Sequence, residues 1–196
     1  MMNKEMEPIG EVVELMLDGS IVLELKNQGY DLIKKPLLSC FIDEEEMVFC
    51  GLRLYKDSID KTRRAVALSM TPEEIESEYP QAAYLVKPYL SAILLGTVHT
   101  NRFASGIQPR NIGLHSQFYA MTDEKYRWFF YDNKALSSVL AQITQNPLTK
   151  SMLKTLCQKF LQLENTPESR VSLFRILGSC LHDDYFSFKD IIMYLR

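Results

Sequence analysis

The spacing of apolar residues at the start of the chain predicts a helix and then an ambiguous segment. Ile9, Val12 and Met16 lie three or four residues apart within residues 8–17, which is the period of one helix face. Residues 21–25 are apolar at four of five positions. They fit either a helix or a short strand, because so short a run does not distinguish the two periods.

Further along, short apolar runs bounded by polar turns are typical of strands. Two runs flank the acidic turn at 43–46 and predict a first hairpin. A second hairpin is expected around the polar turn at 122–125, with aromatic residues on both arms. The predicted strands cover residues 37–42, 47–55, 63–70, 115–121 and 126–131.

Capping residues followed by proline indicate where several helices begin. Thr71, Pro72 and Glu74 form the clearest of these signals. The helix that they begin is expected to run toward Gly96, with interruptions at internal prolines, whose rings remove a backbone donor. The other predicted helices begin at Asp132 or Asn133, at Asn146-Pro147 and at Thr166-Pro167.

The order of these elements predicts an α+β fold. Over residues 8–145 the order is α-β-β-β-α-β-β-α, and a C-terminal helical hairpin follows. Strands joined by hairpins rather than by helical crossovers favour an antiparallel sheet packed with helices. We expect an α+β core domain at 1–145 and a C-terminal helical extension at 146–196, packed on that core as one compact unit.

Composition and charge narrow the classes of function. The chain has 196 residues, of which 46% are hydrophobic, and this is enough for one buried core. The net charge of −3 divides unevenly, because residues 1–50 carry 11 acidic and 4 basic side chains. No dense basic face is expected, which disfavours non-specific nucleic-acid binding. The acidic first quarter would instead steer basic partners.

The expected location is the cytoplasm. Residues 1–7 lack the basic-then-apolar order of a secretion signal. The longest apolar run, at 89–98, has about half the length that a membrane span needs. Four cysteines without a secretion signal are typical of reduced thiols inside a cell.

No catalytic, cofactor-binding or metal-binding motif is found in the sequence. Glycine-rich phosphate loops, the Gly-x-Ser-x-Gly elbow, Cys-x-x-Cys and His-Glu-x-x-His are all absent. Cys180 and His182 carry the strongest rival hypothesis, a thiol or metal site, because a cysteine nucleophile needs a base within reach. Cys180 also lies on the apolar side of its helix, which favours a packed thiol. We predict no catalytic residue, no cofactor and no metal, with Cys40 and Cys50 as core or cross-strand neighbours.

Residues 97–113 are expected to form a long loop, flanked by His99 and His115. Cations beside these histidines suit either an anion site or a solvated loop. A second alternative is a regulatory nucleic-acid binder, for which cations near the loop would contact phosphates. The residues concerned are Arg102, Arg110, Lys125 and Arg127.

Five apolar side chains are predicted to bind a partner protein. Met152, Leu156 and Phe160 form a helical stripe that is expected to receive an amphipathic segment. Trp128 and Phe130 alternate onto one face of the predicted aromatic strand. An exposed aromatic face binds protein more often than nucleic acid.

The element order, the acidic pI near 5.7 and the small size resemble bacterial secretion chaperones. The LvgA-like adaptors of the Legionella type IV (Dot/Icm) coupling complex are similar in size and acidity. The usual type III secretion chaperone is shorter than this chain and has no counterpart of the helical hairpin at 147–181. The resemblance implies a non-catalytic adaptor that binds secretion chaperones, a coupling ATPase and effector segments, without nucleic acid or membrane insertion. A Cys/His-dependent enzyme and a secreted effector are the alternatives.

Overall fold

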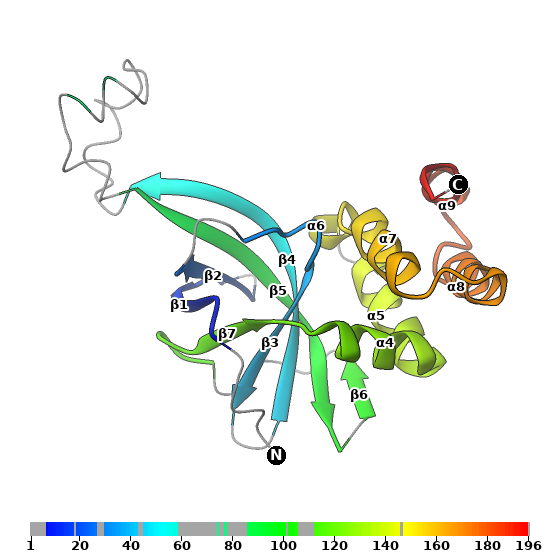
Figure 1. Ribbon diagram of the computed structural model, residues 1–196, viewed down its shortest axis with the longest axis horizontal. Coiled ribbons are helices and arrows are strands. Elements are labelled where there is room, and N and C mark those ends of the chain that lie inside the picture. Colours follow the sequence, from blue (N-terminus) through cyan, green and yellow to red (C-terminus); the bar gives the residue numbers. More distant parts are fainter. Residues whose placement is uncertain are drawn as a thin grey trace.

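The computed structural model describes residues 7–17, 19–26, 30–42, 45–58, 74, 77, 86–100, 102–105, 112–145 and 147–195. Strands fill the first part of the described chain and helices fill the last part (Figure 1). The strands are β1 (Gly10–Leu15), β2 (Ser20–Leu25), β3 (Leu37–Ile42), β4 (Glu45–Ser58), β5 (Val86–His99), β6 (Arg102–Ser105) and β7 (Gln117–Ala120). The helices are α4 (Asp123–Tyr131), α5 (Asn133–Gln145), α6 (Pro147–Lys150), α7 (Leu153–Leu163), α8 (Pro167–Cys180) and α9 (Tyr185–Tyr194).

The antiparallel sheet closes into a small barrel. The strand order is β2-β1-β7-β3-β4-β5-β6, and β2 also pairs with β5 between Ser20↔Ile93 and Glu24↔Tyr89. This additional pairing joins β2, at one end of that order, to β5, the strand next to the other end. The end strand β6 pairs with the C-terminal part of β5, from Gly96 to His99. Closure satisfies backbone groups that an open sheet would leave at its edges.

Two separate cores explain why β3 and β4 are buried on both faces. Leu38 and Phe49 point into the barrel, whereas their neighbours Leu37 and Val48 join the core between the barrel and the helices. Strands covered on both faces carry continuous apolar runs, because alternate side chains reach different cores. The barrel therefore has a packed interior and a second apolar face for the helices.

The helices form a layer on one side of the barrel, with α8 and α9 farthest from it (Figure 1). The core under this layer includes Val139 of α5 and Leu156 of α7, so it crosses the predicted domain boundary at residue 145. None of the described helices has the length and apolar character that a membrane span requires.

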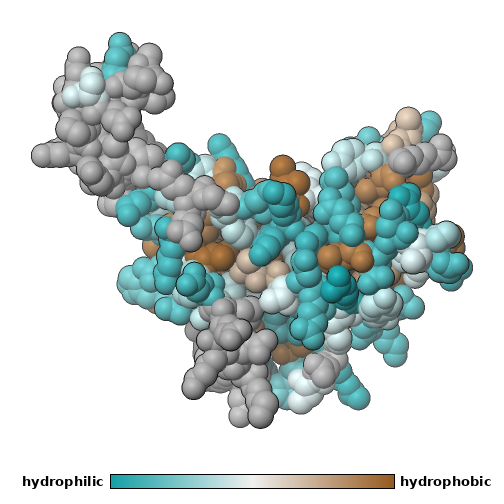
Figure 2. All heavy atoms as spheres, viewed as in Figure 1, coloured by the Kyte–Doolittle hydropathy of each residue, from teal (hydrophilic) through white to brown (hydrophobic). Residues whose placement is uncertain are grey.

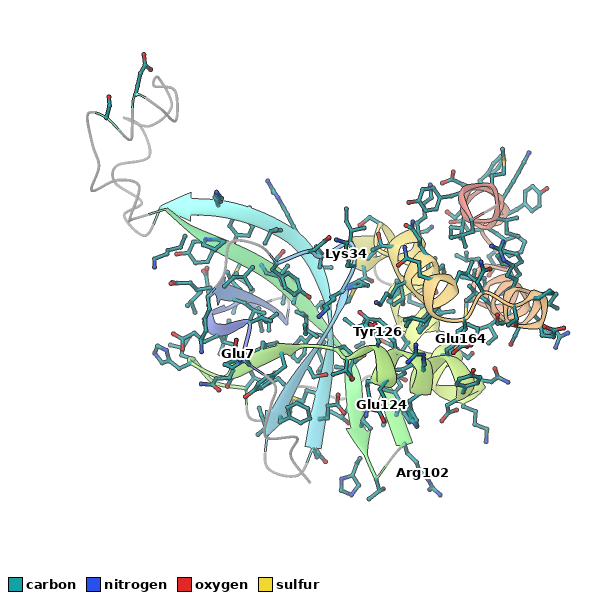
Figure 3. All side chains as sticks on the ribbon, in the orientation of Figure 1. Glu7, Lys34, Arg102, Glu124, Tyr126 and Glu164 are labelled. Atoms are coloured by element: carbon teal, nitrogen blue, oxygen red, sulfur yellow. The ribbon has the colours of Figure 1, made fainter. Side chains whose placement is uncertain are left out.

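Polar contacts attach α4 to its neighbours. The Tyr126 hydroxyl oxygen, buried under the helical layer (Figure 3), accepts a hydrogen bond from the Leu37 backbone N–H at 2.7 Å. The Lys159 Nζ of α7 lies 2.7 Å from the Asp123 carboxylate and 5.3 Å from the centre of the Tyr126 ring. Thr122 caps α4 by accepting a hydrogen bond from the Lys125 backbone N–H. These contacts fix α4 between β3 and α7.

Several predicted elements are confirmed. The α+β class, the antiparallel sheet and the C-terminal helices are as expected. The hairpin of 37–42 and 47–55 forms as β3 and β4, and the ambiguous segment 21–25 lies in strand β2. Helix α5 begins at Asn133, and α8 begins after the Thr166 cap, whose side chain accepts a hydrogen bond from the Ser169 backbone N–H.

Other expectations were wrong. Residues 8–17 contain strand β1 rather than a helix, and the helix expected to reach Gly96 is strand β5 from Val86 onward. The expected loop at 97–113 contains the end of β5 and strand β6. Residues 126–131 belong to helix α4, so the second hairpin is absent and β7 pairs with β1 and β3. The strand predicted at 63–70 and the cap at Thr71 lie outside the described residues.

Candidate protein-binding surface

The structure places the predicted binding stripe in the chain's own core. Met152, Leu156 and Phe160 are buried, as is Phe130, and Trp128 is partly buried against the same core. The Phe160 ring packs at centroid distances of 5.7 Å from Phe130 and 6.0 Å from Tyr126. The prediction of an exposed stripe is corrected, because α4 and the barrel face already cover these side chains.

The Cys180 and His182 hypothesis gains no support from the geometry. The Cys180 thiol donates to the Ser137 carbonyl oxygen at 3.8 Å, and burial raises the pKa of this thiol. His182 lies on the surface, where its Nε2 is 2.9 Å from the Asp183 carboxylate. A thiol held in its protonated form is a weak nucleophile.

The two cysteines of the β3–β4 hairpin, Cys40 and Cys50, face different cores. Cys40 points into the barrel, while Cys50 lies in the core under the helices. Burial raises the pKa of Cys40 to about 11 and that of Cys50 to about 12. They are core residues, as predicted, but they are not cross-strand neighbours. Among the described residues, no cluster of three potential metal ligands is found.

The basic residues near the expected loop are dispersed. The Lys125 Nζ lies 2.7 Å from the Glu46 carboxylate, and the Arg127 Nε lies 3.5 Å from the Glu164 carboxylate. Figure 3 shows Arg102 at the end of β6 and Glu164 in the helical layer, well apart. Arg110 is outside the described residues. Two of the three described cations are therefore compensated by carboxylates.

The tip of the β1–β2 hairpin is a candidate binding surface that the sequence analysis did not identify. Here we call the residues Leu15, Met16 and Leu17 the hairpin tip. Their exposed fractions are 49%, 45% and 110%, so three consecutive large apolar side chains face outward and Leu17 is fully exposed. Isolated exposed apolar residues are ordinary, whereas contiguous ones are typical of interaction sites.

The backbone of the hairpin tip is held in a tight turn. The Gly19 N–H donates to the Met16 carbonyl oxygen at 3.1 Å, and the Met16 N–H donates to the Ser20 carbonyl oxygen at 2.9 Å. Gly19 has a φ of 82°, which a glycine adopts without steric cost. Leu17 therefore lies beside backbone that is held by hydrogen bonds at Met16, Gly19 and Ser20, although its own side chain is fully exposed.

Acidic residues are frequent along the hairpin that carries the tip. The segment 7–25 contains five acidic residues and no lysine or arginine. The nearest compensating contacts lie away from the tip, where His115 Nδ1 is 3.3 Å from the Glu11 carboxylate and Lys87 Nζ is 3.8 Å from the Glu24 carboxylate. An apolar tip on an acidic hairpin is complementary to an apolar pocket bordered by cations.

Sequence reasoning missed this surface because it assigned the segment to a helix. In a helix, Met16 would have faced the core at one-turn spacing from Val12. The signal that could have found the turn is Asp18-Gly19, since this dipeptide flanked by apolar residues is a strong hairpin indicator.

No family model matches the chain, and no curated protein matches it either.

Proposed function

We propose that the protein is a non-catalytic adaptor that binds another protein through the hairpin tip. The observation that carries this proposal is the fully exposed Leu17 on an ordered turn. Backbone hydrogen bonds on both sides of Leu17 reduce the conformational entropy that its backbone loses on binding, and such preorganisation favours affinity. The partner is a protein with an apolar pocket rimmed by lysine or arginine.

The secretion context remains a prediction from the resemblance. That resemblance used an element order that the described residues do not follow, because they begin with strand β1 rather than with a helix. The adaptor proposal rests on the hairpin tip instead. The resemblance adds three kinds of partner to the proposal: cytoplasmic secretion chaperones, a coupling ATPase and effector segments.

The test is capture of partners by the full chain, compared between the wild type and Leu17→Asp. We expect Leu17→Asp to lose the partners that the wild type captures, because a carboxylate cannot enter an apolar pocket without a desolvation penalty. The free energy of unfolding should change by no more than about 0.5 kcal/mol, since surface changes away from packed contacts have small effects.

Val171→Asp is the matched control, because Val171 is also an exposed apolar residue but lies on α8. The variant should capture the same partners as the wild type. Unchanged capture by a folded Leu17→Asp variant would exclude the hairpin tip as the binding surface. Capture should also weaken with added salt, since the acidic residues of the hairpin contribute through screened electrostatics.

A further inference from the structure

Helix α9 presents a second apolar surface, at the far end of the helical layer. Figure 2 shows apolar side chains gathered over the C-terminal helices. Ile191 and Leu195 face the protein core, while Phe186 and Met193 have exposed fractions of 84% and 64%. Tyr185 and Tyr194 are also exposed and flank these two residues. The helix is therefore apolar on its outer face as well as on its packed face.

Polar contacts hold α9 in place, so the outer face is part of the folded structure. The Asp184 side chain caps the helix by accepting a hydrogen bond from the Ser187 backbone N–H at 3.0 Å, and it also bonds to Lys150 of α6. Farther along, the Lys154 Nζ of α7 lies 2.5 Å from the Asp190 carboxylate. These contacts orient the outer face relative to α6 and α7.

The positions of charge on this face are symmetric about its apolar centre. Phe186 and Met193 are seven residues apart, so they lie on nearly one line along the helix. Lys189 lies about 50° to one side of that line and Asp190 about 50° to the other side. The face thus has an apolar centre, a cationic flank and an anionic flank at almost the same height.

We propose that this face binds the same face of a second copy of the chain, with the two α9 helices parallel about a two-fold axis. In this arrangement each Lys189 faces Asp190 of the other copy, and Phe186 and Met193 meet their own counterparts. Such self-complementarity is what an isologous interface requires. An antiparallel arrangement would place Lys189 against Lys189 and Asp190 against Asp190.

Charge complementarity favours a second copy over the other occupants. A strongly acidic or basic partner would meet one flank of its own sign. Lys154 positions the Asp190 carboxylate, which is still 66% exposed and can accept a further hydrogen bond. The dimer is independent of the hairpin tip, which belongs to the barrel at the opposite end of the molecule (Figure 1).

Sedimentation of the full chain tests the proposal. An interface made by one short helix buries less than the ~1,600 Å² of a standard complex, so association is measured from about 5 to about 500 µM. We expect a monomer–dimer equilibrium for the wild type, and a dissociation constant at least about tenfold higher for Phe186→Asp. Leu17→Asp is the matched control and should dimerise like the wild type.

Several results would overturn the proposal. They are a wild type that stays monomeric throughout, an unchanged dimer in Phe186→Asp, and a dimer that is lost in Leu17→Asp. If the wild type is monomeric but Phe186→Asp reduces cosedimentation with phosphatidylcholine–phosphatidylglycerol vesicles, the face contacts lipid instead. Loss of partner capture by Leu17→Asp with an intact dimer separates this proposal from the proposed function.

Complementary charge variants test whether the two flanks meet. Lys189→Glu alone and Asp190→Lys alone should each weaken the dimer, because each places like charges opposite one another. A mixture of the two variants restores both opposite-charge pairs and should associate more tightly than either variant alone, although Asp190→Lys also loses the Lys154 contact. A mixture that associates no better than its components would contradict the facing of these flanks.

Cysteine cross-linking tests the orientation. Phe186→Cys should form a disulfide-linked dimer under mild oxidation, since position 186 meets itself across a parallel pair. The wild type under the same oxidation controls for the native thiols, of which three are buried. Faster cross-linking between Phe186→Cys and Met193→Cys than within either variant would overturn the parallel arrangement.

Discussion

The buried hydroxyl of Tyr126 shows how one polar atom joins the helical layer to the barrel. Its oxygen accepts a hydrogen bond from the Leu37 N–H, and burial raises the pKa of Tyr126 well above the ordinary value. Tyr126→Phe would leave the buried N–H without this partner. We expect a loss of about 1–3 kcal/mol in the free energy of unfolding, measured by urea denaturation.

Tyr119→Phe is the control for that variant, because the Tyr119 hydroxyl bonds to Gln117 at an exposed site. This change should cost much less than Tyr126→Phe. Equal losses in the two variants would contradict a specific role for the buried hydrogen bond between α4 and β3.

The candidate site was only partly predictable at the scale of residues. The pattern of Met152, Leu156 and Phe160 correctly identifies one apolar helix face, but a pattern does not say which surface covers that face. Burial by the chain itself depends on tertiary packing against α4 and the barrel. The exposure of Leu17 follows from the turn that presents it, and the Asp18-Gly19 dipeptide is the local signal for that turn.

At the scale of elements, the capped helices and the β3–β4 hairpin were predictable, whereas β1, β5 and α4 were not. The caps at Asp132 and Thr166 depend on residues close to them in the sequence, so a local motif is enough to predict them. Strand β1 has a register shift between Val12 and Glu14, so its apolar residues do not alternate strictly with polar ones. Their spacing in the sequence therefore resembles that of a helix face. In α4, the strand-like propensity of the aromatic residues yields to burial of Tyr126, Phe129 and Phe130 at helical spacing.

The close approach of β5 and β6 gives an element-scale prediction. A Cβ atom added at Gly96 would lie 2.3 Å from the Ala104 carbonyl oxygen, a backbone atom that cannot rotate away. Gly96→Ala should therefore displace β6 and reduce the free energy of unfolding by about 1–3 kcal/mol. Thermal and urea denaturation measure the loss.

Gly113→Ala provides the comparison, because a Cβ atom there would meet nothing within 4 Å. This variant should be neutral or slightly stabilising, since alanine restricts the unfolded chain. Destabilisation by both substitutions to the same extent would argue against a steric cause at Gly96.

At the scale of the whole molecule, two carboxylates make the helical layer sensitive to acid. Hydrogen bonding from Lys150 and Ser187 lowers the pKa of Asp184, and hydrogen bonding from Lys159 lowers the pKa of Asp123. Because the folded pKa values are depressed, their stabilisation is complete above the unfolded value near 3.8 and is lost as the pH falls below it.

We therefore expect the urea midpoint to fall as the pH is lowered from about 5 to about 2. Asp184→Asn should be less stable than the wild type at pH 7 and should show a smaller dependence on pH, because it has no carboxylate to protonate. Parallel curves for the variant and the wild type would contradict the role of Asp184 in anchoring α9.

The pairing of β1 with β7 sets the order in which the chain can fold during synthesis. Gly10 and Phe118 are hydrogen-bonded neighbours although more than half of the chain separates them. The β1–β2 hairpin therefore leaves the ribosome long before β7, the strand that pairs with β1. Contacts between segments so distant in the sequence form slowly. During that interval the inner apolar side chains of β1 and β2 lack their native cover. We therefore expect the nascent chain to be most prone to aggregation before β7 emerges.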